Sequence, residues 1–299
     1  MFCSFFLLYW FGTYIVFYYI FTFNIKNYKT KAGVFLYYLW KEFVRIKTNI
    51  VVFKKALQIK FGLPLTVDNT PRITLSMVVR NEADKFLRKM LLACIEYVDD
   101  VLIIDDASTD NTVILCEELL HDVPHVIVKN KQSLFANEYI LREQQWKETI
   151  KLDPEWILFL DADEIFEPCF KDQIREVLLS DPGIDVYKFR LFDMWNELEY
   201  RSDDLWNAHL RYVPFIVRYR KEIPYLFEKK VQHCGRIPWN VKYMKSQKSE
   251  LRLQHLGWML PEIREHKYNR YMQLDPDGVC GDIEQYKSIL DKHPTLEKW

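Results

Sequence analysis

Two acidic residues, two positions apart, stand out in Asp161-Ala162-Asp163-Glu164, which follows the apolar run Trp156 to Leu160. In an extended backbone, residues i and i+2 point to the same side, so the carboxylates of Asp161 and Asp163 can address one point. Mg²⁺ and Mn²⁺ favour such oxygen ligands and often share them with substrate phosphates. Acidic residues also cap helices. The pattern alone therefore predicts either a divalent-metal site or a helix cap.

Two further polar clusters follow short apolar runs. One is Arg80-Asn81-Glu82, and the other is Asp105-Asp106 together with Ser108 and Asp110. The carboxyl ends of parallel strands lie along one rim of a sheet, and ligands collect there. We therefore expect all three clusters to contribute to a single site, and their coincidence is more informative than any one of them.

The elements that must position these clusters alternate along the chain. Apolar runs predict strands at 73–79, 101–104, 126–128 and 156–160. Helical periodicity and capping residues predict helices at 87–95, 108–120 and 138–150. This alternation predicts an α/β fold with a mainly parallel sheet covered by helices on both faces.

Residues from about Ile73 to Pro168 resemble the family 2 glycosyltransferases with the GT-A fold. The resemblance is carried by three segments, 76–82 (SMVVRNE), 101–112 (VLIIDDASTDNT) and 159–164 (FLDADE). It implies a Rossmann-like sheet, a nucleotide-diphosphate sugar donor such as a UDP- or GDP-sugar, Mn²⁺ or Mg²⁺, and inversion at the anomeric carbon. One departure is Ala107, where many members have Gly.

The resemblance also implies roles for individual residues. Asp105 would contact the base of the nucleotide, and Asp161 would lie near the ribose and the sugar, within reach of the metal. Asp163 would ligate the metal directly. Arg80 and Glu82, at the end of the first strand, are expected to contact the donor as well.

The C-terminal part resembles a subset of the same enzymes. Residues 253–258 (LQHLGW) match a strand whose histidine completes the metal site, which makes His255 a candidate third ligand. Pro261 suits the first turn of a helix. Lys267 on that helix belongs to a basic face suited to diphosphate oxygens. The alternatives are a structural histidine and an ordinary solvated helix face.

The acceptor is expected to bind in the middle of the chain, where aromatic and polar residues are mixed. Such stretches lie at 192–196, 206–209 and 233–236. An inverting transfer needs a general base. Many relatives place an acidic residue directly after a histidine equivalent to His233, but here Cys234 follows. The candidates for the base are Asp193, Asp204 and Glu228.

The N-terminus has a different composition. Residues 1–25 contain no charged side chain, and a helix of this length can cross a hydrocarbon core of about 30 Å. Lysines at 26, 29 and 31 then predict a membrane-anchored protein whose catalytic domain faces the cytoplasm. Residues 26–70 read as a basic amphipathic juxtamembrane segment with a linker, or as a helix packed on the domain. We assign 71–190 to nucleotide-sugar binding and 191–299 to the acceptor half and C-terminal helices.

Composition limits the classes of partner. A net charge of −1 gives no general attraction to nucleic acid. Six scattered cysteines, never spaced C-x-x-C, indicate free thiols rather than a zinc module or a disulfide framework.

The predicted function is a metal-dependent glycosyltransferase whose acceptor is an envelope glycan, a lipid carrier or a protein. Because the base is unassigned, the alternative is a membrane-tethered sugar-binding or scaffold protein with a decayed site. A phosphatase using the D-x-D motif fits less well, since such enzymes normally carry Thr or Val at the position of Ile165.

Overall fold

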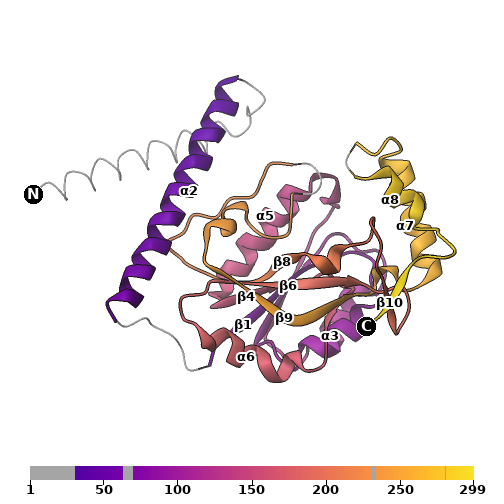
Figure 1. The fold of residues 1–299 in the computed structure, drawn as a ribbon, viewed down its shortest axis with the longest axis horizontal. Helices are drawn as coiled ribbons and strands as arrows, with labels where there is room; N and C mark the ends of the chain where they lie inside the picture. Colours follow the sequence, from indigo (N-terminus) through magenta and orange to yellow (C-terminus); the bar gives the residue numbers. More distant parts are fainter. Residues whose placement is uncertain (1–30, 63–69, 231–233, 280) are drawn as a thin grey trace, which may run out of the picture.

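A mixed eight-stranded sheet crosses the centre of the protein in the computed structural model, which describes residues 31–62, 70–230, 234–279 and 281–299 (Figure 1). Its strand order is β3-β2-β1-β4-β8-β6-β9-β5. The strands are β1 (Ile73–Val79), β2 (Asp100–Asp105), β3 (His125–Lys129), β4 (Trp156–Phe159), β5 (Glu164–Phe166), β6 (Val186–Asp193), β8 (Tyr212–Arg218) and β9 (Ser246–His255). A second sheet pairs β7 (Glu199–Arg201) with β10 (Leu296–Lys298).

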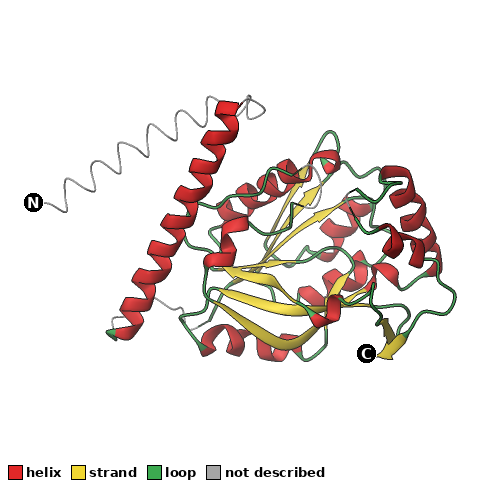
Figure 2. Cartoon of the chain, turned by 45° about the horizontal axis from the view of Figure 1, so that its top comes forward, coloured by secondary structure: helices red, strands yellow, loops and turns green. Residues whose placement is uncertain are grey.

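Helices cover both faces of this sheet (Figure 2). They are α2 (Lys31–Lys60), α3 (Leu87–Cys94), α4 (Thr112–Leu119), α5 (Glu138–Thr149), α6 (Phe170–Ser180), α7 (Pro261–Leu274) and α8 (Ile283–Ser288). Successive side chains of β1 point to opposite faces, so Met77 packs with α3, α4 and α6 while Val78 packs with Leu141 of α5. The predicted α/β class is confirmed.

The predicted mainly parallel sheet needs correction, because only one half of the sheet is wholly parallel. Strands β3, β2, β1 and β4 run parallel, as expected. Beyond them β8 is antiparallel to both β4 and β6, β9 is parallel to β6, and β5 is antiparallel to β9. The chain between β6 and β8 holds no α-helix among its described residues, and a parallel return normally needs a crossover of that kind.

The order of the parallel strands changes direction at β1, and we call the space outside the carboxyl ends of β1, β2 and β4 the crevice. Strand β1 pairs with β2 on one side and with β4 on the other, so the strand order reverses there. Ligands of open α/β sheets bind outside the carboxyl ends of the strands at such a point. The polar clusters predicted from the sequence follow β1, β2 and β4, and therefore border this crevice.

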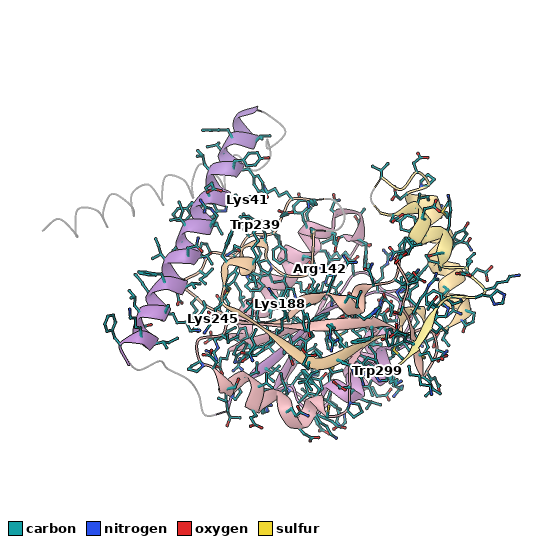
Figure 3. The ribbon with its side chains drawn as sticks, in the orientation of Figure 1. Lys41, Arg142, Lys188, Trp239, Lys245 and Trp299 are labelled. Carbon is teal, nitrogen blue, oxygen red and sulfur yellow. The ribbon has the colours of Figure 1, made fainter. Side chains whose placement is uncertain are left out.

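Helix α2 lies along one side of the domain, away from α7 and α8 (Figure 1). Val44 and Thr48 on its inner face are fully buried, and Thr48 Oγ1 accepts a 3.0 Å hydrogen bond from Asn240 Nδ2. Figure 3 shows Lys41 beside Trp239, with its Nζ 4.3 Å from the ring centroid. The helix therefore packs on the domain.

The predicted membrane-spanning helix, residues 1–25, lies outside the described residues. In the part of the chain that the structure describes, no helix has both the length and the apolar character needed to span a bilayer. This finding contradicts the predicted localisation as a membrane-anchored protein facing the cytoplasm.

Candidate functional site

Strand pairing brings distant parts of the chain together at the acidic motif. Asp161 and Asp163 lie between β4 and β5, directly before Glu164. In the pairing of β5 with β9, Glu164 stands opposite His255, and in the pairing of β6 with β9, Asp193 stands opposite the same histidine. His255 is therefore placed between the acidic motif and the end of β6.

His255 contacts a carboxylate through each ring nitrogen. Its Nδ1 lies 2.7 Å from Asp193 Oδ1, and its Nε2 lies 3.4 Å from Asp163 Oδ2. Burial lowers the pKa of His255, but Asp163 and Asp193 outweigh burial and raise that pKa to about 10. The imidazole is therefore held with Nε2 toward Asp163.

Lys267 and Gly257 complete this group. Lys267 Nζ lies 3.6 Å from Asp163 Oδ2 and 4.2 Å from the ring centroid of Trp258. A methyl group built on Gly257 would lie 2.2 Å from Asp163 Oδ2, 2.3 Å from Lys267 Nζ and 2.8 Å from His255 Nε2. Position 257 therefore has no room for a side chain, because three polar atoms converge on the backbone of Gly257.

Asp161 is bound by a different set of cations. Arg236 Nη2 lies 3.0 Å from Asp161 Oδ2, and Arg142 Nη2 lies 3.6 Å from Asp161 Oδ1. Burial raises the pKa of Asp161, but the two guanidinium groups outweigh it and lower that pKa below its usual value. Arg236 also pairs with both oxygens of Glu164. The two aspartates of the motif thus have separate partners.

Asp163 lies next to two side chains that can carry a positive charge, His255 and Lys267. Burial raises the pKa of Asp163, yet His255 and Lys267 outweigh burial and hold that pKa well below its usual range. Asp163 is therefore ionised at neutral pH, as a metal ligand must be.

Asp105 carries a buried acceptor atom. Its side chain is only 3% exposed, and its Oδ2 accepts a 3.2 Å hydrogen bond from the Ser108 backbone N–H. Asp105 Oδ1 has no hydrogen-bond partner within the described residues. Buried polar atoms are nearly always satisfied in native proteins, so an unsatisfied one points to a missing donor.

Neighbouring residues of the same loops have structural roles. Asp106 is fully buried and accepts hydrogen bonds from the Ser133 hydroxyl at 2.6 Å and the Leu134 backbone N–H at 2.8 Å. Asn81 Oδ1 accepts from the Thr109 backbone N–H at 2.8 Å, which ties the loop after β1 to the loop after β2. These contacts hold the rim on which Asp105 lies.

Arg80 and Glu82 lie at the end of β1, as predicted. Arg80 donates to the Ser133 hydroxyl. Glu82 forms a 2.9 Å ion pair with Lys85. Burial raises the pKa of Glu82, and Lys85 opposes that effect. Both residues border the crevice, with Glu82 within the electrostatic influence of Asp163.

The three predicted base candidates are dispersed. Asp193 is engaged by His255. Glu228 pairs with Lys41 and Lys230, each at 2.9 Å, and hydrogen bonds from these lysines lower its pKa. Asp204 borders a separate cavity of about 520 Å³. The residues lining that cavity are Arg190, Phe192, Tyr200, Ser202, Asp203, Asp204, Asn207, His209, Leu210 and Glu297.

Several residues of the site have no assigned role in the sequence-based prediction. Arg142 belongs to a predicted helix, and nothing in the local pattern marks it. Arg236 and Gly257 stand in the quoted segments 233–236 and 253–258, but their contacts depend on long-range pairing. His233 lies outside the described residues.

Asp163 and His255 can serve a divalent metal as a pair of ligands once His255 releases the Nε2 proton that its raised pKa keeps in place at neutral pH. Two ligands at about 2.1 Å from one Mg²⁺ lie no more than about 4.2 Å apart, and Asp163 Oδ2 and His255 Nε2 are 3.4 Å apart. A carboxylate oxygen with an imidazole nitrogen also suits Mn²⁺. Across 31–62, 70–230, 234–279 and 281–299, no group of three or more His, Cys, Asp or Glu side chains is arranged to hold a metal.

Comparison with known proteins identifies a protein family that matches the chain. The sequence pattern of glycosyl transferase family 2 matches residues 74–235, more than half of the chain. This range contains the acidic motif and the clusters after β1 and β2, and it ends before Gly257 and His255.

Two curated relatives match parts of the chain. An uncharacterised protein of Mycobacterium tuberculosis is 26% identical over 231 residues, covering 70% of this chain and 53% of that protein. The glycosyltransferase SunS of Bacillus phage SPbeta is 27% identical over 133 residues, covering 43% of this chain and 30% of SunS. The chain thus spans about half the length of the first relative and less of the second.

Two solved structures are similar in part. TarS of S. aureus, residues 1–349, matches with a TM-score of 0.47 and 14% identity, over 73% of this chain and 69% of that one. The mannosyltransferase PcManGT from Pyrobaculum calidifontis, solved with GDP-Man and Mn²⁺, matches with a TM-score of 0.42 and 13% identity, over 83% and 79%.

Proposed function

This chain belongs to glycosyl transferase family 2, and on that premise we propose that it moves a sugar from a nucleotide-diphosphate donor to an acceptor, with inversion and with the help of Mn²⁺ or Mg²⁺. The observation that carries the proposal is the convergence of Asp163 Oδ2, His255 Nε2 and Lys267 Nζ beside Gly257. These residues bring a carboxylate, an imidazole nitrogen and the ammonium group that pairs with Asp163 to one place.

We assign the metal to Asp163 and His255. When bound, the ion would neutralise negative charge that develops on the leaving diphosphate. Asp193 accepts the Nδ1 hydrogen of His255 and so keeps Nε2 directed at Asp163. Lys267 would move from Asp163 to the diphosphate oxygens as the ion takes its place.

We assign the nucleotide to the loop after β2. Asp105 Oδ1 is buried and has no partner in the described chain, so it is suited to accept the ring N–H of uracil or guanine. This preference supports a UDP- or GDP-sugar. The rigid hydrogen-bonded rim around Asp106 and Asn81 supports the loop in a fixed position.

The remaining donor contacts fall to residues around Asp161. Its carboxylate is bound by Arg236 and Arg142, so we place Asp161 near the ribose and the sugar rather than on the metal. Arg80 and Glu82, which follow β1, keep their assignment to the donor.

The base belongs to the acceptor half in this proposal. Asp193 orients His255, and Glu228 is neutralised by two lysines. Asp204 has an exposed side chain that borders the separate cavity, so we keep it as the candidate base to be tested. The acceptor would be a glycan, a lipid carrier or a protein, and replacing Asp204 by Asn would lower transfer to it.

A donor panel tests the function. The protein is incubated with Mn²⁺ and UDP-, GDP- or dTDP-sugars, and release of the nucleoside diphosphate is measured. We expect slow hydrolysis of one donor, lost in Asp163→Ala and kept in the matched control Asp122→Ala, whose carboxylate is on the surface. If no donor is hydrolysed or bound, the protein is a sugar-binding or scaffold protein and the enzyme proposal is wrong. Hydrolysis that survives Asp163→Ala would refute the metal assignment alone.

A further inference from the structure

Helix α2 presents different residues to its domain and to the opposite side. The inner face makes specific polar contacts: Lys41 pairs with Glu228 at 2.9 Å, and Lys55 pairs with Asp185 at 2.7 Å. Thr48, between them, is fully buried. The inner positions are Tyr37, Lys41, Val44, Thr48, Val51 and Lys55. Half of these side chains are charged or carry a small hydroxyl, so α2 is docked through both polar and apolar groups.

The outer face is more apolar than the docked one. Its residues are Leu36, Leu39, Phe43, Ile46, Ile50, Phe53 and Leu57, spaced alternately by three and four, and Lys60 ends the series. We call this set the outer stripe. Its side chains include Ile46, Ile50 and Phe53, which are 39%, 43% and 63% exposed. Figure 1 shows α2 beside the domain, with one long side turned away from the sheet.

The exposed side chains and the spacing of the outer stripe indicate a binding surface. Five of its side chains, those of Leu39, Ile46, Ile50, Phe53 and Leu57, are exposed, and soluble proteins rarely leave so much apolar surface along one helix in water. Alternate spacing by three and four residues keeps a stripe on one face with a period of 3.5, which is the pattern of helices that pair as a coiled coil. With 30 residues, α2 extends over about 45 Å and holds four such repeats.

We propose that α2 pairs in parallel with α2 of a second copy of this chain, through the outer stripe. In heptad terms Leu36, Phe43, Ile50 and Leu57 occupy positions a, and Leu39, Ile46, Phe53 and Lys60 occupy positions d. Seven of these eight positions are apolar, which matches the buried seam of a two-stranded coil.

The charges beside the stripe select the parallel arrangement. Glu42 lies at position g and Lys47 at the following position e, so Glu42 of one helix faces Lys47 of the other across a parallel seam. Lys54, the next position e, faces the neutral Asn49. In an antiparallel pair, positions e face one another, and Lys47 and Lys54 would be set against lysines. The parallel pair avoids that repulsion.

The docked domains leave room for this pairing. Because the outer stripe and the docked face lie on opposite sides of α2, the two domains would lie on the outer sides of the helix pair. In a parallel pair their crevices would face the same end of the assembly. The proposal concerns a surface apart from the crevice and stands independently of the proposed function.

Cysteine cross-linking in the full chain tests the proposal. Ile50 and Ile59 are equally exposed, at 43% and 42%, but only Ile50 belongs to the stripe. A disulfide needs Cα atoms about 4.4–6.8 Å apart, which symmetric positions a can meet. We expect mild oxidation to link Ile50→Cys chains into covalent dimers, while Ile59→Cys remains at the background of the unmodified protein. Equal cross-linking of the two variants would overturn the proposal.

The mass in solution provides a second test. We expect light scattering to give the mass of a dimer for the unmodified chain and for Ile59→Lys, and that of a monomer for Ile50→Lys, with unchanged circular dichroism in all three. A monomeric unmodified chain would overturn the proposal. A dimeric Ile50→Lys variant would also overturn it. So would a monomeric protein whose outer stripe binds lipid vesicles or residues 1–30.

Discussion

Replacing Lys267 by Met should tighten the binding of Mn²⁺ to the nucleotide-free protein. Lys267 Nζ lies 3.6 Å from Asp163 Oδ2, so its positive charge occupies the position that the metal needs. Two unit charges about 4 Å apart interact by about 4 kcal/mol at an effective dielectric constant of 20. Both side chains are about one-fifth exposed, and solvent screening reduces the net effect to about 1–2 kcal/mol. We therefore expect a gain in Mn²⁺ affinity of about 5- to 30-fold.

The assay is a titration of Mn²⁺ followed by electron paramagnetic resonance, first without and then with UDP or GDP. Lys267→Met should bind free Mn²⁺ more tightly but bind the nucleoside diphosphate less tightly than the unmodified protein, because the ammonium group is then absent. Lys267→Arg keeps the charge and should resemble the unmodified protein. Lys171→Met, on the exposed side of α6, is the matched control. Unchanged or weaker Mn²⁺ binding by Lys267→Met would refute the reasoning.

Three further changes test other contacts. Gly257→Ala should abolish Mn²⁺ binding with little loss of thermal stability, because its methyl group would lie 2.2 Å from Asp163 Oδ2; unaltered Mn²⁺ titration would contradict this. Asp193→Asn should lower Mn²⁺ affinity by about 10- to 100-fold, since it removes the carboxylate that orients a ligand, and a variant with normal affinity would remove Asp193 from this role. Burial lowers the pKa of Lys55 to about 8, against 10.5 unfolded, despite its pairing with Asp185. Between pH 8 and pH 10.5 the unfolded chain therefore binds more protons at Lys55 than the folded one. The free energy of unfolding should rise with pH in this range, relative to that of Lys55→Met, and denaturant titrations at pH 7 to 10 would measure it.

The parallel half of the fold could be predicted because its signals are local. The run 73–79 is apolar except for Thr74 and Ser76 and becomes β1 with the predicted bounds, buried at every position. The helix at 138–150 appears as α5, Glu138–Thr149. Buried parallel strands produce continuous apolar runs, and helices covering them produce a 3.6-residue period, so each element can be recognised without its partners.

The mixed half could not be predicted in this way. The position of His255 beside Asp163 depends on the pairing of β9 with both β5 and β6, which joins segments far apart in the chain. No local pattern encodes that register. The same holds for Arg236, whose approach to Asp161 and Glu164 depends on how a long loop returns to the sheet.

The basic helix shows what a composition argument leaves open. The lysines of residues 26–60 suited either a membrane surface or a helix packed on the domain, and two of them have partners in the domain: Lys41 pairs with Glu228, and Lys55 with the buried Asp185. Basic residues on an amphipathic helix predict an anionic partner without specifying whether that partner is a lipid or a carboxylate. The distinction depends on tertiary contacts.

The most direct measurement of the central claim is calorimetric binding of UDP and GDP with and without Mn²⁺. We predict that one of the two nucleotides binds the unmodified protein and Asp122→Ala tightly only when Mn²⁺ is present, and that Asp163→Ala and His255→Ala lose this metal-dependent gain. Nucleotide binding that is equally tight without the metal, or a metal-dependent gain that survives in Asp163→Ala, would contradict the assignment of the site.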